Sequence, residues 1–282
     1  MSRTFYITEV FSEAPYGGNQ LATVLDASDM SMNEMQKIAR GFNFSETTFI
    51  VGGNHKDGFD VRIFTPAGEL PFAGHPTLGS AYLARQLYCR GDESVVQLNL
   101  GIGPIPVTFA DDDVLWMKQK APVFGDIIAR EQVAATLGLS VADLSDTNPC
   151  QYVSTGLEFL IVPLVSHSAL QRIKIQNDDF GHGLFAFCPQ GYTANQQISA
   201  RMFAASLDVI EDPATGSANG CLAGYLVEHK FFGDSAVDVR VGQGYEIARP
   251  STLYLQARKS DGEFDVKVGG KVRIVAQGEW KL

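Results

Sequence analysis

One short sequence occurs twice in this chain, and the two copies lie about half a chain length apart. The copies span residues 69–76 and 211–218, and they share Glu, Pro and Gly at the same offsets. Each copy is followed by a segment of small and apolar residues. A repeated turn that leads into a repeated apolar helix predicts two related half-domains.

The length and composition suit such an arrangement. A chain of 282 residues is long enough for two domains. Its content of 45% hydrophobic and 19% charged residues indicates a globular protein. The net charge of −10 argues against a nucleic-acid partner, because phosphate binding needs a basic surface. A small anionic substrate stays compatible with this charge, since the N-terminus of a helix binds anions locally.

Cysteine and histidine spacing gives no sign of a metal site. The four cysteines are far apart without any C-x-x-C pair, and the five histidines lack the spacing of metal ligands. We therefore expect reduced thiols in a cytoplasmic protein with no metal site. No apolar run reaches 18 residues and the N-terminus lacks the apolar core of a signal peptide, so we expect no membrane partner.

The expected elements alternate between strands and a few helices. Ser31 and Glu34 form a capping box that predicts a helix ending with Gly41 as its C′ residue. The segments after the two copies are apolar around most of their circumference, which predicts two helices buried on nearly all sides. The fold class is therefore α+β, with two sheets that each wrap around a buried helix.

The same pattern places the boundaries of two lobes. We expect an N-terminal lobe over residues 1–118 and a C-terminal lobe over 119–269, because residues 119–125 contain the Pro and Gly of a linker. The C-terminal tail, residues 270–282, can return to the first lobe.

Different residues come after the matched glycines of the two copies. His75 follows Gly74 and Ser217 follows Gly216, so a symmetric scaffold carries different chemistry, as expected for an active site between two lobes. The free N–H groups at the two helix starts would hold a carboxylate or enolate-like charge. The ordinary alternatives are a helix cap or a packed side chain for His75 and an N-cap for Ser217.

Two carboxylates complete the set of candidate groups. Asp212 belongs to an acidic pair just before the second helix, where N-capping is the ordinary explanation. Glu46 lies in an unusually apolar neighbourhood, and burial there would raise its pKa and let it shuttle a proton. The alternative for Glu46 is a surface residue at the start of a strand.

Several segments resemble the signatures of the PhzF phenazine biosynthesis family. They are Asn-Phe-Ser-Glu-Thr at 43–47, residues 64–77, which include the first copy, and the second copy at 211–218. Gly18-Asn19 and Gln243-Gly244, the latter with 249–251, resemble motifs near the ends of that family. The matches cover nearly the whole chain in family order. One departure is Gln20, which stands where the family usually has Pro and makes the first loop less rigid.

The resemblance implies a diaminopimelate epimerase-like fold. Its two pseudo-symmetric lobes each wrap a mostly antiparallel sheet around a central helix, and the site lies in the cleft between them. It also implies a cofactor-independent isomerase that moves a proton within a small carboxylate-bearing substrate, a cyclic amino acid in the phenazine enzyme. A homodimer is compatible with the resemblance, although no stripe of apolar residues in the sequence requires a dimer interface.

The resemblance also assigns roles to residues of this chain. The catalytic residues implied are Glu46, which would move the proton, with His75 and Asp212. The substrate-binding residues implied are Asn19, Gly74, Gly216 and Ser217.

Two other functions stay open. Related racemases and epimerases use one cysteine per lobe, at the places held here by His75 and Ser217. Cys221 lies about one helical turn beyond Ser217 and should pack inside. An epimerase of an amino-acid derivative would therefore need non-cysteine bases, because a hydroxyl is too weak an acid to replace a thiol unaided. The other alternative is a relative that binds a small ligand without turnover.

Overall fold

The chain forms two compact units in the computed structural model, which describes residues 2–89, 93–175, 183–204 and 209–281. Unit 1 comprises Met1–Met117 with Gly270–Leu282, and unit 2 comprises Lys118–Gly269. Each unit contains its own set of strands and its own buried helix. None of the helices in the described ranges is long and apolar enough to cross a membrane.

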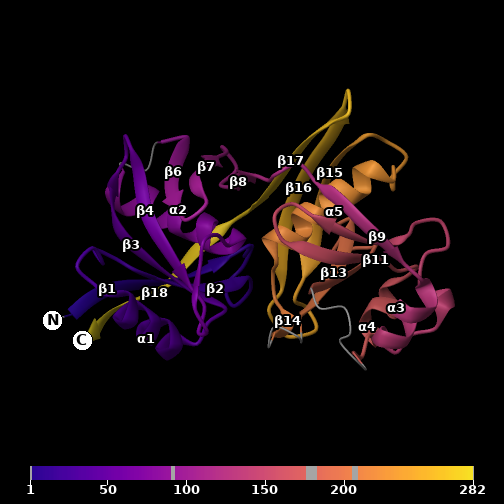
Figure 1. Ribbon diagram of the computed structural model, residues 1–282, viewed down its shortest axis with the longest axis horizontal. Helices are drawn as coiled ribbons and strands as arrows, with labels where there is room; N and C mark the ends of the chain where they lie inside the picture. The colour runs from indigo at the N-terminus through magenta and orange to yellow at the C-terminus, as the bar shows by residue number, and fades with distance from the viewer. Residues whose placement is uncertain (1, 90–92, 176–182, 205–208, 282) are drawn as a thin grey trace. The chain divides into compact units, whose positions relative to one another are not determined.

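Unit 1 is a mostly antiparallel sheet with two helices, and its strands come from both ends of the chain. The strands are β1 (Ser2–Val10), β2 (Asn19–Val24), β3 (Glu46–Asn54), β4 (Gly58–Phe64), β5 (Glu69–Leu70), β6 (Val95–Leu100), β7 (Gly103–Phe109), β8 (Leu115–Lys118) and β18 (Val272–Lys281). The first and last strands, β1 and β18, pair antiparallel along their whole length (Figure 1). The pairs β2–β3 and β4–β6 are parallel.

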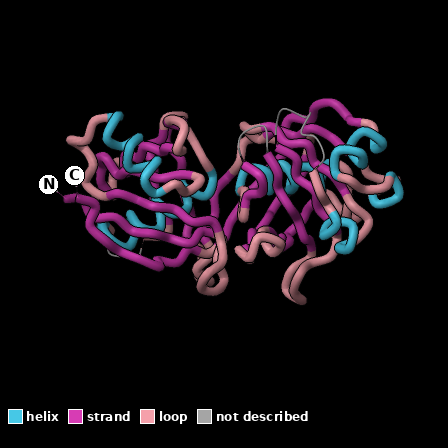
Figure 2. The backbone as a smooth tube through the Cα atoms, turned by 90° about the horizontal axis from the view of Figure 1, so that it is seen from below, coloured by secondary structure: helices cyan, strands magenta, loops and turns pink. Residues whose placement is uncertain are grey.

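The helix α2 (Gly74–Tyr88) forms the centre of unit 1. Strands β1, β2, β3, β4, β6, β7 and β18 all contact it, and Figure 2 shows the strands of this unit running around it. Gly79 permits this close packing, because a Cβ atom there would lie 2.5 Å from Cδ2 of Leu21. The prediction of a helix buried on nearly all sides is confirmed.

The helix α1 (Met32–Phe42) has the predicted capping box, formed by Ser31 and Glu34. Its predicted end is wrong, because Asn43 and not Gly41 adopts the left-handed conformation after the last turn, with φ of 54°. Asn tolerates this conformation better than most residues. Gly41 stays within the helix, where Trp280 of β18 packs so closely that a Cβ atom would lie 2.7 Å from its ring.

Unit 2 repeats this plan with a larger set of elements. Its strands are β9 (Val123–Ile128), β10 (Cys150–Ser154), β11 (Glu158–Pro163), β12 (Gly183–Cys188), β13 (Ile198–Ala204), β14 (Val209–Asp212), β15 (Ala236–Gln243), β16 (Ser251–Ser260) and β17 (Glu263–Gly270). Its helices are α3 (Arg130–Leu137), α4 (His167–Arg172) and α5 (Gly216–Glu228), with a 3₁₀ turn over Val141–Asp143. The helix α5 packs on β10, β11, β15 and β16.

The helix α5 is buried at every position except Ser217 and Glu228. Gly224 lets Pro122 approach, since a Cβ atom there would lie 2.8 Å from the proline ring. Cys221 is fully buried as predicted, and all four cysteines are free thiols. An α+β protein with a buried helix in each unit is therefore the observed fold class.

Two strands and one α-helix of unit 2 have no counterpart among the elements that the sequence predicts. The strand β9 begins at Val123, inside the stretch 119–125 that the sequence suggests as a linker. The other two are the short helix α4 and the four-residue strand β14. Short elements contain too few residues to show a hydrophobic period, so sequence patterns detect them poorly.

Candidate active site

Three elements of unit 1 bring predicted site residues together. Glu46 is the first residue of β3 and lies opposite Leu21 in the parallel register with β2. The strand β2 itself begins at Asn19. His75 is the second residue of α2, and its ring hydrogen-bonds to the backbone of Gln20. The start of α2 therefore lies next to the starts of β2 and β3.

Glu46 and His75 are direct neighbours in this cluster. Oε2 of Glu46 lies 3.5 Å from Nε2 of His75. The side chains are 16% and 7% exposed, so the Glu46 carboxylate is not the solvated surface group that the sequence left open. The pair places a carboxylate and an imidazole within reach of one transferable proton.

His75 is held in its neutral form. Burial lowers the pKa of the imidazole to about 3 and outweighs the hydrogen bond to the Gln20 backbone, which acts in the opposite direction. Nε2 of His75 is buried and has no hydrogen-bond partner among the described residues. An unpartnered buried polar atom costs free energy, and such atoms are typical of functional sites.

Acidification is expected to destabilise the protein through His75. The folded pKa is about 3 and the ordinary value is 6.5, so between these values the unfolded chain binds more protons. The free energy of unfolding should rise with pH through this window, by up to about 1.4 kcal/mol per pH unit. The variant His75→Gln should show a shallower rise, measured as the thermal midpoint across the window. Equal slopes in the two proteins would contradict a buried neutral imidazole.

The two repeated helices start without caps. The N-cap residues are Ala73 for α2 and Thr215 for α5, and neither side chain makes a capping hydrogen bond. No acidic residue lies in the first turn of either helix, whereas α1 has a complete capping box. The first N–H groups of both helices thus have no partner within the helix and carry its positive end. Such a helix start is suited to a carboxylate or a developing negative charge.

None of the three candidate residues near these helices is an N-cap. His75 and Ser217 are both the second residue of their helices, and Asp212 ends β14. The N-cap positions themselves are held by Ala73 in α2 and by Thr215 in α5. Gly74 and Gly216 are the first residues of α2 and α5.

Asp212 is held by a chain of hydrogen bonds in unit 2. The Thr215 hydroxyl donates to Oδ2 of Asp212 at 2.5 Å, and Nε2 of Gln243 donates to that hydroxyl at 3.1 Å. The same Gln243 nitrogen donates to the Asp212 carbonyl at 2.9 Å. Gln243 is fully buried, so its amide fixes both the backbone and the carboxylate of Asp212.

The Gln243 amide also ties this turn to α5. Its Oε1 accepts from Nδ2 of Asn219 at 3.0 Å and from the backbone N–H of Thr215 at 3.3 Å. Sequence reasoning missed Thr215 and Asn219 as parts of the site and used Gln243 only as a motif residue. A usable signal exists in the aligned copies: Asp212 and Thr215 replace Leu70 and Ala73 together, so only the second copy has this polar pair.

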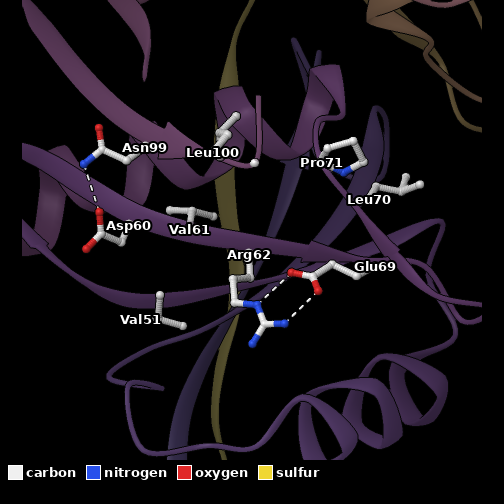
Figure 3. A pocket seen from close by; sticks show the side chains of 10 residues that line it. Val51, Asp60, Val61, Arg62, Glu69, Leu70, Pro71, Asn99 and Leu100 are labelled. Atoms are coloured by element: carbon white, nitrogen blue, oxygen red, sulfur yellow. Dashed lines mark hydrogen bonds and ion pairs between the residues drawn. The ribbon is translucent and has the colours of Figure 1, made fainter. Parts of the chain in front are cut away.

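An open pocket of about 460 Å³ lies elsewhere on unit 1 (Figure 3). Residues of β3, β4, β5 and β6 line it together with Pro71 and Gly101, and two of the lining residues, Arg62 and Glu69, form an ion pair. None of the seven predicted site residues is among its lining residues. Within the described ranges, no group of three or more His, Cys, Asp or Glu residues is arranged to hold a metal ion.

Comparisons with known proteins cover nearly the whole chain and indicate one family. Residues 8–278 match the family described as phenazine biosynthesis-like protein, PhzC-PhzF. The trans-2,3-dihydro-3-hydroxyanthranilate isomerase of Pseudomonas aeruginosa is 32% identical over 280 residues, covering 97% of this chain and 98% of that enzyme.

Solved structures show the same relationship. A PhzF-family protein from Bacillus anthracis superimposes with a TM-score of 0.90 at 28% identity, with full coverage of both chains. A probable proline racemase from Agrobacterium radiobacter gives a TM-score of 0.60 at 10% identity, covering 99% and 93% of the two chains, which shows a shared fold. The chain therefore belongs to the phenazine biosynthesis-like family, PhzC-PhzF, and is an isomerase of that family.

Proposed function

We propose that this protein is a cofactor-independent isomerase that moves a proton within a small carboxylate-bearing substrate. The observation that carries the proposal is the contact of Glu46 with a buried, neutral His75 beside the uncapped start of α2. The relative named for trans-2,3-dihydro-3-hydroxyanthranilate supplies the first compound to test, a cyclic amino acid.

The reaction that these groups support has two proton transfers. Glu46 as carboxylate removes a proton from a substrate carbon, and the electron pair of the broken C–H bond spreads into the neighbouring double bond. Glu46, now protonated, returns the proton to the other end of the delocalised system, and the double bond shifts. The N–H groups at a helix start stabilise the negative charge while it exists.

His75 contributes as a neutral imidazole in this proposal. A ring with a pKa of about 3 carries no charge near neutral pH because burial disfavours the imidazolium. Because its other ring nitrogen donates to the Gln20 backbone, Nε2 of the neutral ring can accept one hydrogen bond without placing a second charge beside Glu46. The unpartnered Nε2 is the atom available to a polar group of the substrate.

Asp212 completes the acid–base set in the proposal, and we assign it to the same substrate. Its carboxylate is oriented by Thr215 and Gln243, so it can accept a hydrogen bond from an amine or hydroxyl group in a fixed direction. Asn19, Gly74, Gly216 and Ser217 are the substrate-binding residues, with the glycines acting through backbone N–H groups.

The second candidate function is epimerisation. The fold shared with a probable proline racemase favours it. It would require inversion at a substrate α-carbon by groups other than thiols, because His75 and Ser217 follow the two matched glycines. The intact set of acid–base groups argues against the third candidate, a protein that binds a small ligand without converting it.

One experiment separates the three functions. The protein is incubated in heavy water with trans-2,3-dihydro-3-hydroxyanthranilate and with a panel of small cyclic and amino-acid carboxylates, and the products are followed by NMR. A shifted double bond is the expected result. Inversion with deuterium at the α-carbon would instead show an epimerase. Thermal stabilisation by a compound that exchanges no proton and is not converted would show a binding protein.

A further inference from the structure

An arginine precedes the first copy of the repeat and pairs with its glutamate. In β4, Arg62 lies over the ring of Phe64, with 5.2 Å from its guanidinium carbon to the ring centre. Its Nε and Nη2 donate to the two carboxylate oxygens of Glu69, each at 2.7 Å (Figure 3). Both side chains of this pair are about one-third exposed.

The second copy has the same arrangement in a buried setting. In β13, Arg201 lies 4.9 Å from the ring centre of Phe203, and its Nε and Nη2 donate to Glu211 at 2.9 and 2.7 Å. The Arg201 and Glu211 side chains are only 9% and 6% exposed. The repeat therefore extends beyond the octapeptide to an Arg-x-Phe segment in the preceding strand.

The two copies differ in the residue that comes directly after the glutamate. Leu70 follows Glu69, whereas Asp212 follows Glu211, so the second copy has two adjacent carboxylates. Neighbouring residues of a strand point to opposite faces of the sheet. Only one of the two carboxylates can therefore lie on the face that leads to Thr215 and α5.

The backbone pairing of β14 is too short and irregular to determine which of the two carboxylates faces Thr215. It has four residues, and its pairing with β13 shifts register between Met202 and Ala204. In the observed register Met202 lies opposite Asp212, while Arg201 and Phe203 occupy the other face of β13. A slip by one residue would exchange the faces of Glu211 and Asp212.

We propose that the buried ion pair of Arg201 with Glu211 sets the register of β14 and thereby selects Asp212 as the carboxylate presented to Thr215. Arg201 is itself anchored, because its Nη1 donates to the carbonyl of Leu170 in α4 at 3.1 Å. A two-point ion pair at a fixed position holds Glu211 on its own face more strictly than a single charge would. Arg201 and Glu211 are thus positioning residues, and their effect on turnover rests on the proposed role of Asp212.

The double variant Arg201→Met with Glu211→Met tests this inference. Arg201 also lies 3.9 Å from the Glu246 carboxylate, which keeps its hydrogen bond from the Tyr192 hydroxyl, so the variant should unfold cooperatively but at a lower temperature than the wild type. Without the register constraint, amide hydrogens of residues 209–218 should exchange about tenfold faster or more. With trans-2,3-dihydro-3-hydroxyanthranilate as substrate, kcat should fall about 10- to 100-fold while KM changes less than about threefold.

The pair in unit 1 provides the matched control. The double variant Arg62→Met with Glu69→Met removes the same chemical groups where no second carboxylate competes, so kcat should stay within about threefold of wild type. If the unit 2 variant does not fold, Arg201→Lys keeps the charge, loses the two-point contact and should show the same faster exchange.

The two readouts separate this inference from the proposed function. Unchanged exchange at residues 209–218 would overturn the register role whatever the activity. Faster exchange together with wild-type kcat would show that the register does not control Asp212 in catalysis, which also overturns the proposal. If the wild-type protein converts no tested compound, the proposed function fails, and the exchange result still decides the register role.

Discussion

The variant Glu46→Gln is expected to lose turnover while it keeps most of its substrate binding. Glutamine has nearly the same shape as glutamate and can occupy the same place beside His75, but its amide cannot take up and return a proton. General acid–base catalysis contributes about 10²- to 10⁴-fold to rates, so kcat should fall by a factor in this range. Binding is measured as thermal stabilisation by trans-2,3-dihydro-3-hydroxyanthranilate, and turnover is measured by NMR with the same compound.

A matched control for this variant lies in the same unit. Glu279 is an exposed carboxylate of β18 that accepts a hydrogen bond from the Thr4 hydroxyl at 2.7 Å. The variant Glu279→Gln makes the identical chemical change away from the α2 start and should keep wild-type kcat. If Glu46→Gln retains turnover, Glu46 is not the proton-transferring group and the proposed mechanism is wrong.

The variant Asp212→Asn is expected to lower kcat about 100-fold, with a smaller change in KM. The side-chain carbonyl oxygen of asparagine can still accept the hydrogen bond from the Thr215 hydroxyl, so the turn formed with Gln243 should persist. The negative charge is lost, however, and one acceptor oxygen becomes an N–H donor. The substrate group that Asp212 orients would therefore lose its partner mainly in the transition state.

Asp238 provides the control for this second variant. It is an exposed residue of β15 whose carboxylate accepts from Nε2 of Gln256 at 3.1 Å. Asp238→Asn should leave both kcat and KM near the wild-type values. Because Glu46 belongs to unit 1 and Asp212 to unit 2, losses of kcat in both variants with one compound would support their action on the same substrate. A normal kcat in Asp212→Asn would remove unit 2 from the proton-transfer chemistry.

Local sequence signals predicted most of the fold correctly. The capping box of Ser31 and Glu34 is where the sequence places it. The two buried helices follow the repeated octapeptides, because a Pro- and Gly-containing turn and an apolar segment are both local properties. The family and the isomerase class follow from the motifs, since these span nearly the whole chain.

Local signals failed where a distant residue decides the structure. Gly41 is a good C′ residue by composition, yet Trp280 of β18 packs against it and the helix continues to Phe42. The strand β9 starts inside a stretch that contains Pro and Gly because β10 pairs with it. Such contacts join residues far apart in the chain, and no periodicity in the sequence records them.

The candidate site shows the same division. The sequence marks His75 and Asp212 as chemically capable residues, but the unpartnered Nε2 of His75 and the Thr215–Asp212 hydrogen bond are visible only in three dimensions. The strongly lowered pKa of His75 is a consequence of burial, which depends on every element packed around the ring.

The amino-acid order alone determined the repeat, the helices that follow it, the α+β class and the family, because these depend on turn chemistry and on the spacing of apolar residues. The tertiary structure decided which polar atoms meet: Glu46 with His75, Asp212 with Thr215 and Gln243, and Glu211 with Arg201. The physical reason is that desolvation and hydrogen-bond geometry arise between segments that are brought together only by folding.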